Sequence, residues 1–476
     1  MRGVRGVQRA AGGRRVRAAP GVALGEVLTG APPSRPPFTV EPAHDRAQYH
    51  ALRRAVFVEE QGLFAGDDHD ERDADPRLVV LLARDRERTL LGGVRLGPAT
   101  ERDIGWWFGG RLVVTPAGRA VGGVGAALVR AACAHAEAAG ALRFDAEVQG
   151  ANGRFFARLG WEHVRSCTVA GRPHVLMRWP IGRLAVATVG KHPLGSLLRG
   201  FHLGGAGFAG DDGSPVPGSD MVAACDAVLP SMVERDPEWA GWCSVLVNIN
   251  DLAAMGAAPV GLLDAVAGRD AAFVATVLSG LRAAAGAYAV PVLGGHTQFG
   301  VPAALSVTAL GRTDRPVPGG GGRPGHRVRL TADLGGGWRP GYPGHQWDST
   351  TARRTPELRA MLGAVAVARP AAAKDVSMAG LTGTLGMLAE ASGCGAVLDV
   401  AAVPRPAGTT VGDWFTCFPG FAMLSADAPG APALPAGPAV STECGELVVG
   451  GGVALRWPDG ELTDAVGAVV TGMGRA

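Results

Sequence analysis

Ser244-Val-Leu-Val-Asn-Ile-Asn-Asp-Leu-Ala-Ala-Met-Gly-Ala-Ala-Pro259 is the stretch that decides the fold of the larger half of this chain. Val245–Val247 is a short apolar run, typical of a buried strand. The sequence then turns polar at Asn248 and Asn250-Asp251 and continues rich in alanine, which predicts a helix that stops near Pro259. Asp251 is therefore expected at a strand-to-helix junction, where a helix N-terminus attracts anions. A carboxylate there can hold Mg²⁺ against a phosphate, and the alternative is a plain N-cap.

Further acids stand on both sides of this stretch, in Gly210-Asp-Asp-Gly213, at Asp226 and in Lys374-Asp-Val-Ser377. Carboxylates that a fold gathers without a cation repel one another, and Mg²⁺ ions bridging to ATP phosphates remove that repulsion. Each acid alone is also compatible with a turn or a cap. As an ordered set they predict a metal–nucleotide site, and the expected metal ligands are Asp211, Asp212, Asp226 and Asp251.

The order of these motifs resembles the AIR-synthase-like (PurM-like) ATP-binding superfamily, which includes thiamine-monophosphate kinase and selenophosphate synthetase. Its most specific piece is Asn250–Ala257, placed after Asp226 and Asp236-Pro-Glu238, and the resemblance covers roughly residues 184–476. It implies two mixed α/β subdomains, ATP and Mg²⁺ as cofactors, and phosphorylation of a substrate oxygen or activation of an amide carbonyl. It also implies a homodimer formed through this half. The residues expected at the nucleotide are Asn250, Asp251 (as a catalytic residue), Thr297 and Lys374.

Two positions depart from that family's pattern. His296 stands in Gly294-Gly-His-Thr297 where an Asp is common, and imidazole is a poor ligand for Mg²⁺. Met378 follows Ser377 where thiamine-monophosphate kinase-like members carry a second Asp. The substrates of known members therefore do not transfer to this chain. Lys374 is one of only two lysines, and phosphate binding and a surface position are equally compatible with it.

The first half, residues 38–182, alternates strands with helices, and a glycine-rich loop, Gly118–Gly125, precedes the expected helix 126–139. Such a loop before a helix is a phosphate-binding arrangement. A Rossmann fold is one interpretation, because Asp145 and Glu147 follow about 20 residues later. However, the glycines do not fit G-x-G-x-x-G, because Leu128 occupies the third position.

Asn152-x-x-Phe-Phe-x-x-Leu-Gly-Trp161 after a strand resembles the acyl-CoA-binding half of GNAT acetyltransferases, as do Val114-x-Pro116-x-x-Arg119 and Phe57-Val58-x-Glu60-Gln61. The resemblance implies transfer of an acyl group from acetyl-CoA to an amine. In such a fold the strand 112–114 pairs with the pantetheine and the loop amides bind the pyrophosphate. The residues implied at the cofactor are Val113, Val114, Arg119, Gly122, Gly123, Gly125, Ala126, Asn152 and Phe156.

Amine acylation needs a group that takes the amine proton, and usually an acid that protonates the thiolate. Glu60 and Glu147 are the candidate bases, beside a water relay. Many relatives use a tyrosine as the acid, but Tyr49 is the only tyrosine here and lies far upstream. Solvent is the alternative donor, together with three side chains of the last strands, His163, Cys167 and His174. The acidic run 67–75 is expected to be solvated, or else to attract a cationic amine.

The charge is uneven: residues 1–37 carry +6, whereas the rest of the chain is close to neutral. Neither a nucleic-acid footprint nor a membrane span is indicated. We expect residues 1–37 to be a disordered arm. The seven cysteines stand singly, which argues against a zinc site or a disulfide framework and favours a cytosolic protein.

We therefore expect an α/β and α+β multidomain protein: a basic arm (1–37), a GNAT-like domain (38–182) and two PurM-like subdomains (184–315 and 323–476). The arrangement resembles a bacterial fusion family associated with nitrilase-containing gene clusters. The expected function is a bifunctional enzyme for small-molecule substrates, an N-acyltransferase joined to an Mg-ATP-dependent phosphoryl-transfer or ligase domain. The alternative is that one half is inactive and serves in regulation or dimerisation.

Overall fold

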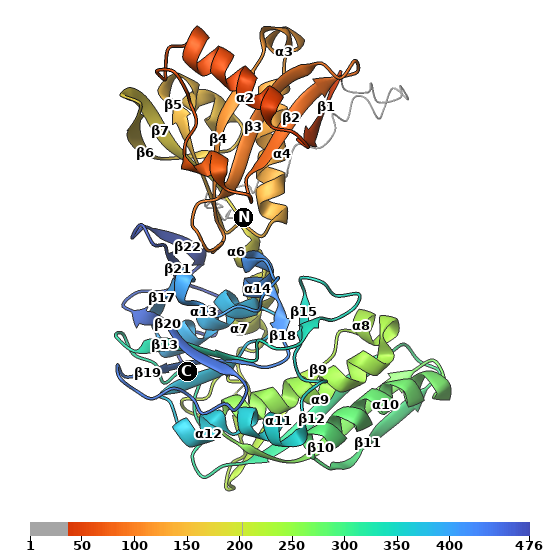
Figure 1. Cartoon of the computed structure of the whole chain (residues 1–476). Helices are drawn as coiled ribbons and strands as arrows, with labels where there is room; N and C mark the ends of the chain where they lie inside the picture. The colour runs from red at the N-terminus through yellow and green to blue at the C-terminus, as the bar shows by residue number, and fades with distance from the viewer. Residues whose placement is uncertain (1–36, 202) are drawn as a thin grey trace, which may run out of the picture.

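The computed structural model describes residues 37–201 and 203–476, so the expected arm 1–37 lies almost entirely outside the described residues. The chain forms two bodies stacked one above the other (Figure 1). The upper body holds the first half, and the lower body holds the two subdomains of the second half. The connection runs through the short helix α6 (Arg183–Val186) at the narrow level where the two bodies meet.

The first half is one seven-stranded sheet, in the order β1-β2-β3-β4-β5-β7-β6. Its strands are β1 Phe38–Pro42, β2 Val79–Asp85, β3 Leu90–Pro98, β4 Trp106–Val114, β5 Arg143–Gln149, β6 Glu162–Val169 and β7 Arg172–Trp179. Its helices are α2 Ala47–Arg53, η1 Arg54–Glu60, η2 Glu71–Ala74, α3 Pro116–Val121, α4 Val124–Ala138, η3 Gly150–Asn152 and α5 Gly153–Arg158. The amphipathic helix α4 packs its buried residues, such as Leu128 and Val129, against β2, β3 and β4.

Only one pair of neighbouring strands in this sheet is parallel. β4 pairs with β5 over Trp106–Gly109 and Arg143–Ala146, and every other neighbouring pair is antiparallel. The Rossmann interpretation is therefore wrong, because a dinucleotide fold needs a mostly parallel sheet. Beyond Gly109 the two strands no longer pair. A bulge at Arg111, whose φ is 53°, bends β4 at this place.

The N-terminal subdomain of the second half has a five-stranded sheet in the order β11-β10-β12-β9-β8. The strands are β8 Ser214–Pro215, β9 Met221–Ala227, β10 Ala258–Gly268, β11 Val292–Phe299 and β12 Ala304–Arg312. Helices α8 Pro230–Arg235, α9 Pro237–Ala254 and α10 Ala271–Tyr288 accompany them. Helices α9 and α10 cover one face of this sheet (Figure 1).

The stretch from Ser244 to Pro259 is not a strand followed by a helix, so that prediction is wrong. It is the second half of the single helix α9, which ends at Ala254, and Pro259 lies in β10. Asp236 caps α9 by accepting a hydrogen bond from the Trp239 amide, and Pro237 occupies its first turn. The run Val245–Val247 is apolar because this part of α9 is buried on all sides.

The C-terminal subdomain has a seven-stranded sheet in the order β16-β19-β13-β20-β17-β21-β22, and a small sheet β14-β15-β18 beside it. The strands are β13 Arg327–Ala332, β14 Gly337–Trp338, β15 Gln346–Asp348, β16 Ala372–Asp375, β17 Gly395–Asp399, β18 Phe418–Pro419, β19 Ala422–Asp427, β20 Val440–Val448, β21 Val453–Arg456 and β22 Leu462–Val466. The helices are α11 Thr355–Leu362, α12 Ala364–Ala368, α13 Gly380–Ser392, η5 Val400–Ala402 and α14 Val411–Thr416. Between the two halves run η4 Val189–Lys191 and α7 Leu194–Leu197.

A buried ionic and aromatic contact joins the two bodies. Arg143 of β5 donates to the carboxylate of Asp459 at 3.0 and 2.8 Å and to Glu461 at 2.9 Å, both in the turn between β21 and β22. Its guanidinium also lies 4.0 Å from the ring centroid of Trp106. Ile104 and Leu142 of the first half belong to the same hydrophobic core as the C-terminal subdomain. The halves therefore share a packed interface.

Among the described residues, one helix, α10, is long and apolar enough to cross a membrane by length and composition alone. Within the fold its buried residues Phe273, Val277 and Leu281 belong to hydrophobic cores, and α10 packs closely against α9. All seven cysteines are free thiols, and five of them are buried.

Candidate functional site

Three carboxylates from distant parts of the second half meet in one cluster. Asp212 comes from the loop before β8, Asp251 from the last turn of α9, and Asp375 from the end of β16. One oxygen of each lies within 4.8 Å of the others. We call these three residues the acidic cluster. Asp226, at the end of β9, lies near enough for its charge to act on both Asp251 and Asp375.

Burial and mutual repulsion make the charged form of this cluster unfavourable. Burial raises the pKa of Asp251 well above its usual range, and the charges of Asp375, Asp226 and Asp212 raise it further. The pKa of Asp375 is raised well above its usual range by the same causes. Asp251 is near the C-terminal end of α9, where the helix dipole also disfavours a negative charge. The expected helix N-terminus at Asp251 is thus absent, and the carboxylates themselves define the site.

Lys374 is buried beside the cluster, so the surface alternative for this residue is wrong. Its ammonium donates to Asp212 at 2.6 Å and to the carbonyl of Gly210 at 3.3 Å. Burial alone would lower the pKa of Lys374, but the charges of Asp212 and Asp211 raise it overall, which keeps the amine protonated. Asp375 also donates its backbone amide to Asp212 at 3.0 Å. Lys374 therefore holds the carboxylate of Asp212 in place within the cluster.

Asp211 stands apart from the acidic cluster, although it was expected among the metal ligands. One of its carboxylate oxygens accepts a hydrogen bond from the Gly319 amide at 2.9 Å, and the other is buried with no partner in the described part of the chain. Burial raises its pKa to about 6. Asn250, by contrast, lies beside Asp251 on α9. Its amide donates to the Gly420 carbonyl at 3.0 Å, and its buried carbonyl oxygen has no partner within residues 37–201 and 203–476.

Thr297 does not reach the cluster. Gly294–Thr297 lies inside strand β11, at the edge of the sheet, and β11 is three strands away from β9 with its Asp226. Neighbouring strands are about 4.8 Å apart, so this separation is roughly 14 Å. His296 and Thr297 are both exposed, and Met378 is exposed after Ser377.

Asp375 belongs to the acidic cluster although it was not among the expected metal ligands. Its signal was the motif Lys374-Asp375 directly after the buried residues Ala372 and Ala373. A carboxylate at the end of a buried strand is a recurrent position for a ligand-binding group.

A cavity lies in the first half, where β4 and β5 diverge. It is bounded by the ends of both strands, by η1 and by the segment that contains η2. The residues that line it include Phe57, Arg72, Phe108, Arg111, Leu112, Glu147, Asn152, Phe156 and His174. Glu147, Asn152 and Phe156 were all expected at an acyl-transfer site, and the fold brings them together around this cavity.

Helix α4 begins where the glycine-rich loop was expected to bind phosphate. The loop is shorter than expected, because Pro116–Val121 forms the helix α3 and α4 already begins at Val124. Gly122 and Gly123 both have φ of 73°, which favours glycine. A side chain at either position would meet no atom within 4 Å, so the backbone is open to a ligand there. Gly125 and Ala126 lie in the first turn of α4, where amides have no helical acceptor.

Glu60 and Arg119 form an ion pair across the end of β4. The two terminal guanidinium nitrogens of Arg119 each donate to the Glu60 carboxylate at 2.9 Å. The hydrogen bond from Arg119 lowers the pKa of Glu60, which weakens it as a base. Neither residue is among those that line the cavity. Val113 is buried, and Val114 is half-buried beside Gly125.

The acid candidates differ in access to the cavity. His174 lines it, and the Nδ1 of its ring lies 2.9 Å from the Arg172 carbonyl. His163 is exposed on β6, and Cys167 pairs with His174 across the sheet. Tyr49 is fully buried, and its hydroxyl donates to the Arg111 carbonyl at 2.7 Å. Among these four side chains, only His174 is a lining residue.

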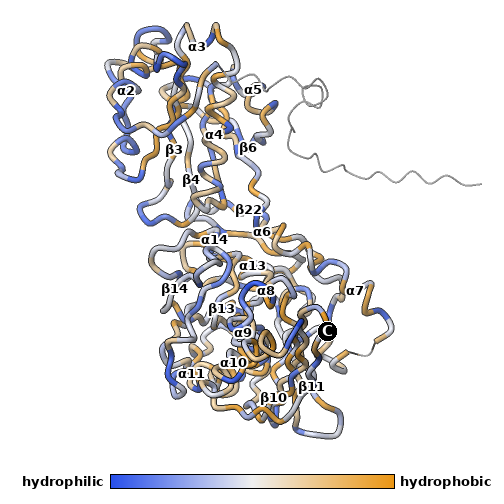
Figure 2. Tube along the Cα trace, turned by 90° about the vertical axis from the view of Figure 1, so that its right-hand side faces the viewer, coloured by the Kyte–Doolittle hydropathy of each residue, from blue (hydrophilic) through white to orange (hydrophobic). Residues whose placement is uncertain are grey.

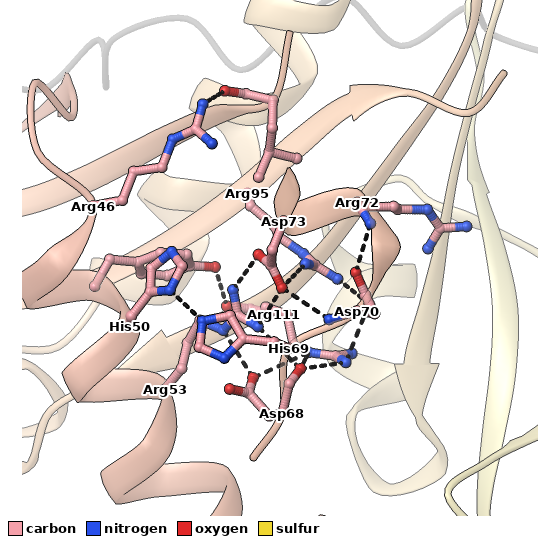
Figure 3. Close-up of polar contacts among 12 residues, drawn as sticks. Arg46, His50, Arg53, Asp68, His69, Asp70, Arg72, Asp73, Arg95 and Arg111 are labelled. Atoms are coloured by element: carbon pink, nitrogen blue, oxygen red, sulfur yellow. Dashed lines mark hydrogen bonds and ion pairs between the residues drawn. The ribbon is translucent and has the colours of Figure 1, made fainter. Parts of the chain in front are cut away.

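The acidic run 67–75 is solvated only in part, because Asp67 and Glu71 are exposed whereas Asp68 is buried. Asp68, Asp70 and Asp73 turn inward and bind three arginines from α2, β3 and β4 (Figure 3). The arginine–aspartate network consists of Arg53, Arg95, Arg111, Asp68, Asp70 and Asp73. Arg53 and Asp68 are almost fully buried and lie 2.8 Å apart. These aspartates are neutralised and do not attract a cationic amine.

Comparison with known proteins places the second half. The model of the AIR synthase related protein N-terminal domain matches residues 210–313, and that of the C-terminal domain matches residues 323–457. The Synechocystis protein sll0787 is 36% identical over 222 residues, which are 45% of this chain and 69% of that protein. A thiamine-monophosphate kinase of Halobacterium salinarum is 33% identical over 211 residues, 41% of this chain and 69% of the kinase.

Among solved structures, T. maritima PurL complexed with ADP has a TM-score of 0.50 at 17% identity. The match covers 62% of this chain and 52% of PurL, and it shows a shared fold. Both family models begin after residue 209, and their boundary near residue 320 coincides with the linker between the two sheets of the second half. The chain belongs to the AIR synthase related protein family.

Proposed function

We propose that the second half is an Mg-ATP-dependent enzyme that transfers a phosphoryl group to a small metabolite or activates it for ligation. The acidic cluster carries this proposal. Asp212, Asp251 and Asp375 offer oxygen ligands only, which suits a hard cation such as Mg²⁺. Their burial and their raised pKa values are the expected features of carboxylates that a cation neutralises.

The residues present fit such a cation. Asp212, Asp251 and Asp375 would hold it, with Asp226 close by. Asn250, the residue before Asp251 on α9, has a buried side-chain carbonyl oxygen without a partner among the described residues, and we include it as a candidate nucleotide contact. A bound Mg²⁺ would neutralise charge on the transferring phosphoryl group. The chain's own part is to gather the carboxylates, and Lys374 orients Asp212 by a 2.6 Å ion pair.

The names of the relatives support the same reaction class. Several relatives that are at least 31% identical are thiamine-monophosphate kinases, and solved structures of this fold include PurL complexed with ADP. Exposed Met378 after Ser377, and Thr297 on a distant strand, are reasons not to transfer their substrates. The test is titration of the whole protein with Mg-ATP, followed by the same titration of Asp251→Asn. Equal affinities would remove the acidic cluster from the nucleotide site.

For the first half, we propose acyl transfer from acetyl-CoA to an amine in a GNAT-like fold. The observation that carries it is the divergence of β4 and β5 beside the open N-terminus of α4. Unpaired backbone groups of β4 beyond Gly109 can pair with a pantetheine amide, while Gly122, Gly123 and the first turn of α4 offer amides to a pyrophosphate. Glu147 is the better candidate base, because Glu60 is tied to Arg119.

Calorimetry with acetyl-CoA tests this second proposal. Gly123→Asp would place a carboxylate where the pyrophosphate is expected and should abolish binding, whereas Gly171→Asp, at a turn between β6 and β7, should not. Wild-type protein that ignores acetyl-CoA would refute the acyl-transfer proposal. Single-turnover assays of each activity in the whole protein would also decide the alternative that one half is inactive.

We also propose that the second half forms a homodimer through the exposed edge strand β11 of the β11-β10-β12-β9-β8 sheet. Every residue of the edge strand β11 is exposed, including Val292, Leu293 and Phe299, and Leu263 of β10 is exposed next to them. Figure 2 colours much of the chain around β10 and β11 as hydrophobic. An exposed apolar edge strand is a template for pairing with another chain. By light scattering we expect the wild type to be a dimer and Leu293→Lys to be a monomer. A monomeric wild type would refute the dimer proposal.

A further inference from the structure

Arg72 is the cation that the first half leaves exposed on its cavity wall. It lies in η2, directly beside the arginine–aspartate network, and its guanidinium carbon is 4.0 Å from the ring centroid of Phe108. Both residues line the cavity that also contains Glu147 and His174. Figure 3 shows the Arg72 side chain directed away from the network, into which Arg53, Arg95 and Arg111 point.

The network leaves no aspartate over for Arg72. Three arginines and three aspartates pair within it, so their charges cancel. Asp70 accepts a hydrogen bond from the backbone amide of Arg72 at 3.1 Å. Within the described residues, the side chain of Arg72 forms no ion pair or hydrogen bond with a carboxylate. A positive charge therefore remains on the cavity wall, while the more deeply placed arginines are already satisfied.

The stacking on Phe108 orients this charge for a planar anion. A guanidinium that lies over an aromatic ring keeps its N–H groups in its own plane, free to donate at the edge. Paired parallel N–H groups match the two oxygens of a carboxylate. Glu147 lies within Coulombic reach of Arg72. The cavity thus presents a site for an anion close to a carboxylate that can receive a proton from an ammonium or amine.

We propose that the acyl acceptor is a small amine that also carries a carboxylate, and that Arg72 binds this carboxylate while the amine lies toward Glu147. The inference rests on the acyl transfer proposed above. In that reaction the amine nitrogen forms a bond to the acyl carbon, the carbon–sulfur bond of the thioester breaks, and the amine proton passes to Glu147. The leaving thiolate takes a proton from solvent or from His174. Arg72 is a specificity residue in this scheme and takes no part in proton transfer.

The experiment measures acetyl transfer by the whole protein to matched acceptors. The panel contains L-amino acids, their carboxamides, the corresponding amines without a carboxyl group, and O-phosphoethanolamine as the phosphate-bearing amine. We expect kcat/KM for the best amino acid to exceed that of its carboxamide at least tenfold. Arg72→Met should remove this preference, mainly by raising KM for the amino acid, and leave the carboxamide unchanged. Arg72→Lys should recover part of it.

Two controls separate this inference from the acyl-transfer proposal on which it rests. Arg165→Met, on the edge strand β6 and outside the cavity lining, should behave as wild type. The Kd of acetyl-CoA, measured by calorimetry, should be the same for wild type and Arg72→Met. If wild type uses carboxamides as well as amino acids, or prefers the phosphate-bearing amine, the carboxylate inference is wrong and acyl transfer stands. If wild type binds acetyl-CoA but acetylates none of the panel, the carboxylate inference is wrong, and acyl transfer is supported by acetyl-CoA binding alone. If wild type does not bind acetyl-CoA, both the acyl-transfer proposal and the carboxylate inference are refuted.

Discussion

Asp251→Asn tests the acidic cluster most directly, because it removes one charge and keeps the shape. The cluster oxygens lie within 4.8 Å of one another. At that distance two charged carboxylates repel by about 3.5 kcal/mol in a medium of effective dielectric constant near 20. Without a cation the protein relieves part of this by holding a proton, so we expect the metal-free variant to be about 1–3 kcal/mol more stable than wild type at pH 8.

The pH dependence has a definite sign. The pKa of Asp251 is raised in the folded protein, so the wild type loses stability as the pH rises through that raised pKa. Below the unfolded-state pKa of aspartate the residue is protonated in both states, and the advantage of the variant should vanish. Urea unfolding of both proteins in EDTA at pH 8 and near pH 3 measures this difference.

Asp251→Asn should weaken Mg-ATP binding, although it stabilises the metal-free protein. Loss of one of three charged ligands is expected to lower the affinity for Mg-ATP at least tenfold, which corresponds to about 1.4 kcal/mol. The matched control is Asp220→Asn, an exposed aspartate paired with Arg312, which should alter neither quantity. A variant that is less stable than wild type at pH 8 and binds Mg-ATP with equal affinity would refute the reasoning on both counts.

Three further predictions concern the packing that holds the sites. Arg53→Met should cost about 3–5 kcal/mol in urea unfolding, because Asp68 and Asp73 each lose one of two arginine partners and three aspartates then face only two arginines, whereas exposed Arg88→Met should cost less than about 1 kcal/mol. Gly241→Ala should lower stability by more than about 2 kcal/mol, because the added Cβ would meet the Val277 carbonyl of α10 at 2.0 Å; a neutral result would contradict the close approach of α9 and α10. Arg143→Met should make the connection between the halves more susceptible to limited proteolysis, and an unchanged cleavage pattern would contradict a stabilising role for this contact.

The sequence predicted the elements better than it predicted their junctions. The expected helix 126–139 is α4, Val124–Ala138, because its apolar periodicity is set by one buried face. Helix α9 was misread because it is buried all round, and a wholly buried helix has no polar face to reveal its period. Its start was nevertheless encoded in the cap Asp236 and the following proline.

Partnerships between charges were the least predictable feature. The local sequence of residues 67–75 is typical of a solvated loop, and nothing within it reveals that Arg53, Arg95 and Arg111 will reach it from α2, β3 and β4. The same holds for Asp375, which joins Asp212 and Asp251 only because β16 ends beside α9. Each of these contacts spans long stretches of chain, whereas propensities and motifs describe neighbours in sequence.

The contact between the two halves connects the cavity of the first half to the C-terminal subdomain of the second half. The sequence predicts separate domains at residues 38–182 and 184–315, and the structure adds a contact between the two halves. Arg143 and Asp145 are almost fully buried at this contact, and Arg178 bridges Asp145 to Glu461 at 2.5–3.1 Å. Arg143 and Asp145 lie on β5, the same strand that carries Glu147 at the cavity. From Arg143 to Glu147 is four residues, roughly 13 Å of extended chain. The hairpin β21–β22 thus anchors the strand that positions the candidate base Glu147. Separating the halves at α6 would therefore expose the buried charges of Arg143 and Asp145.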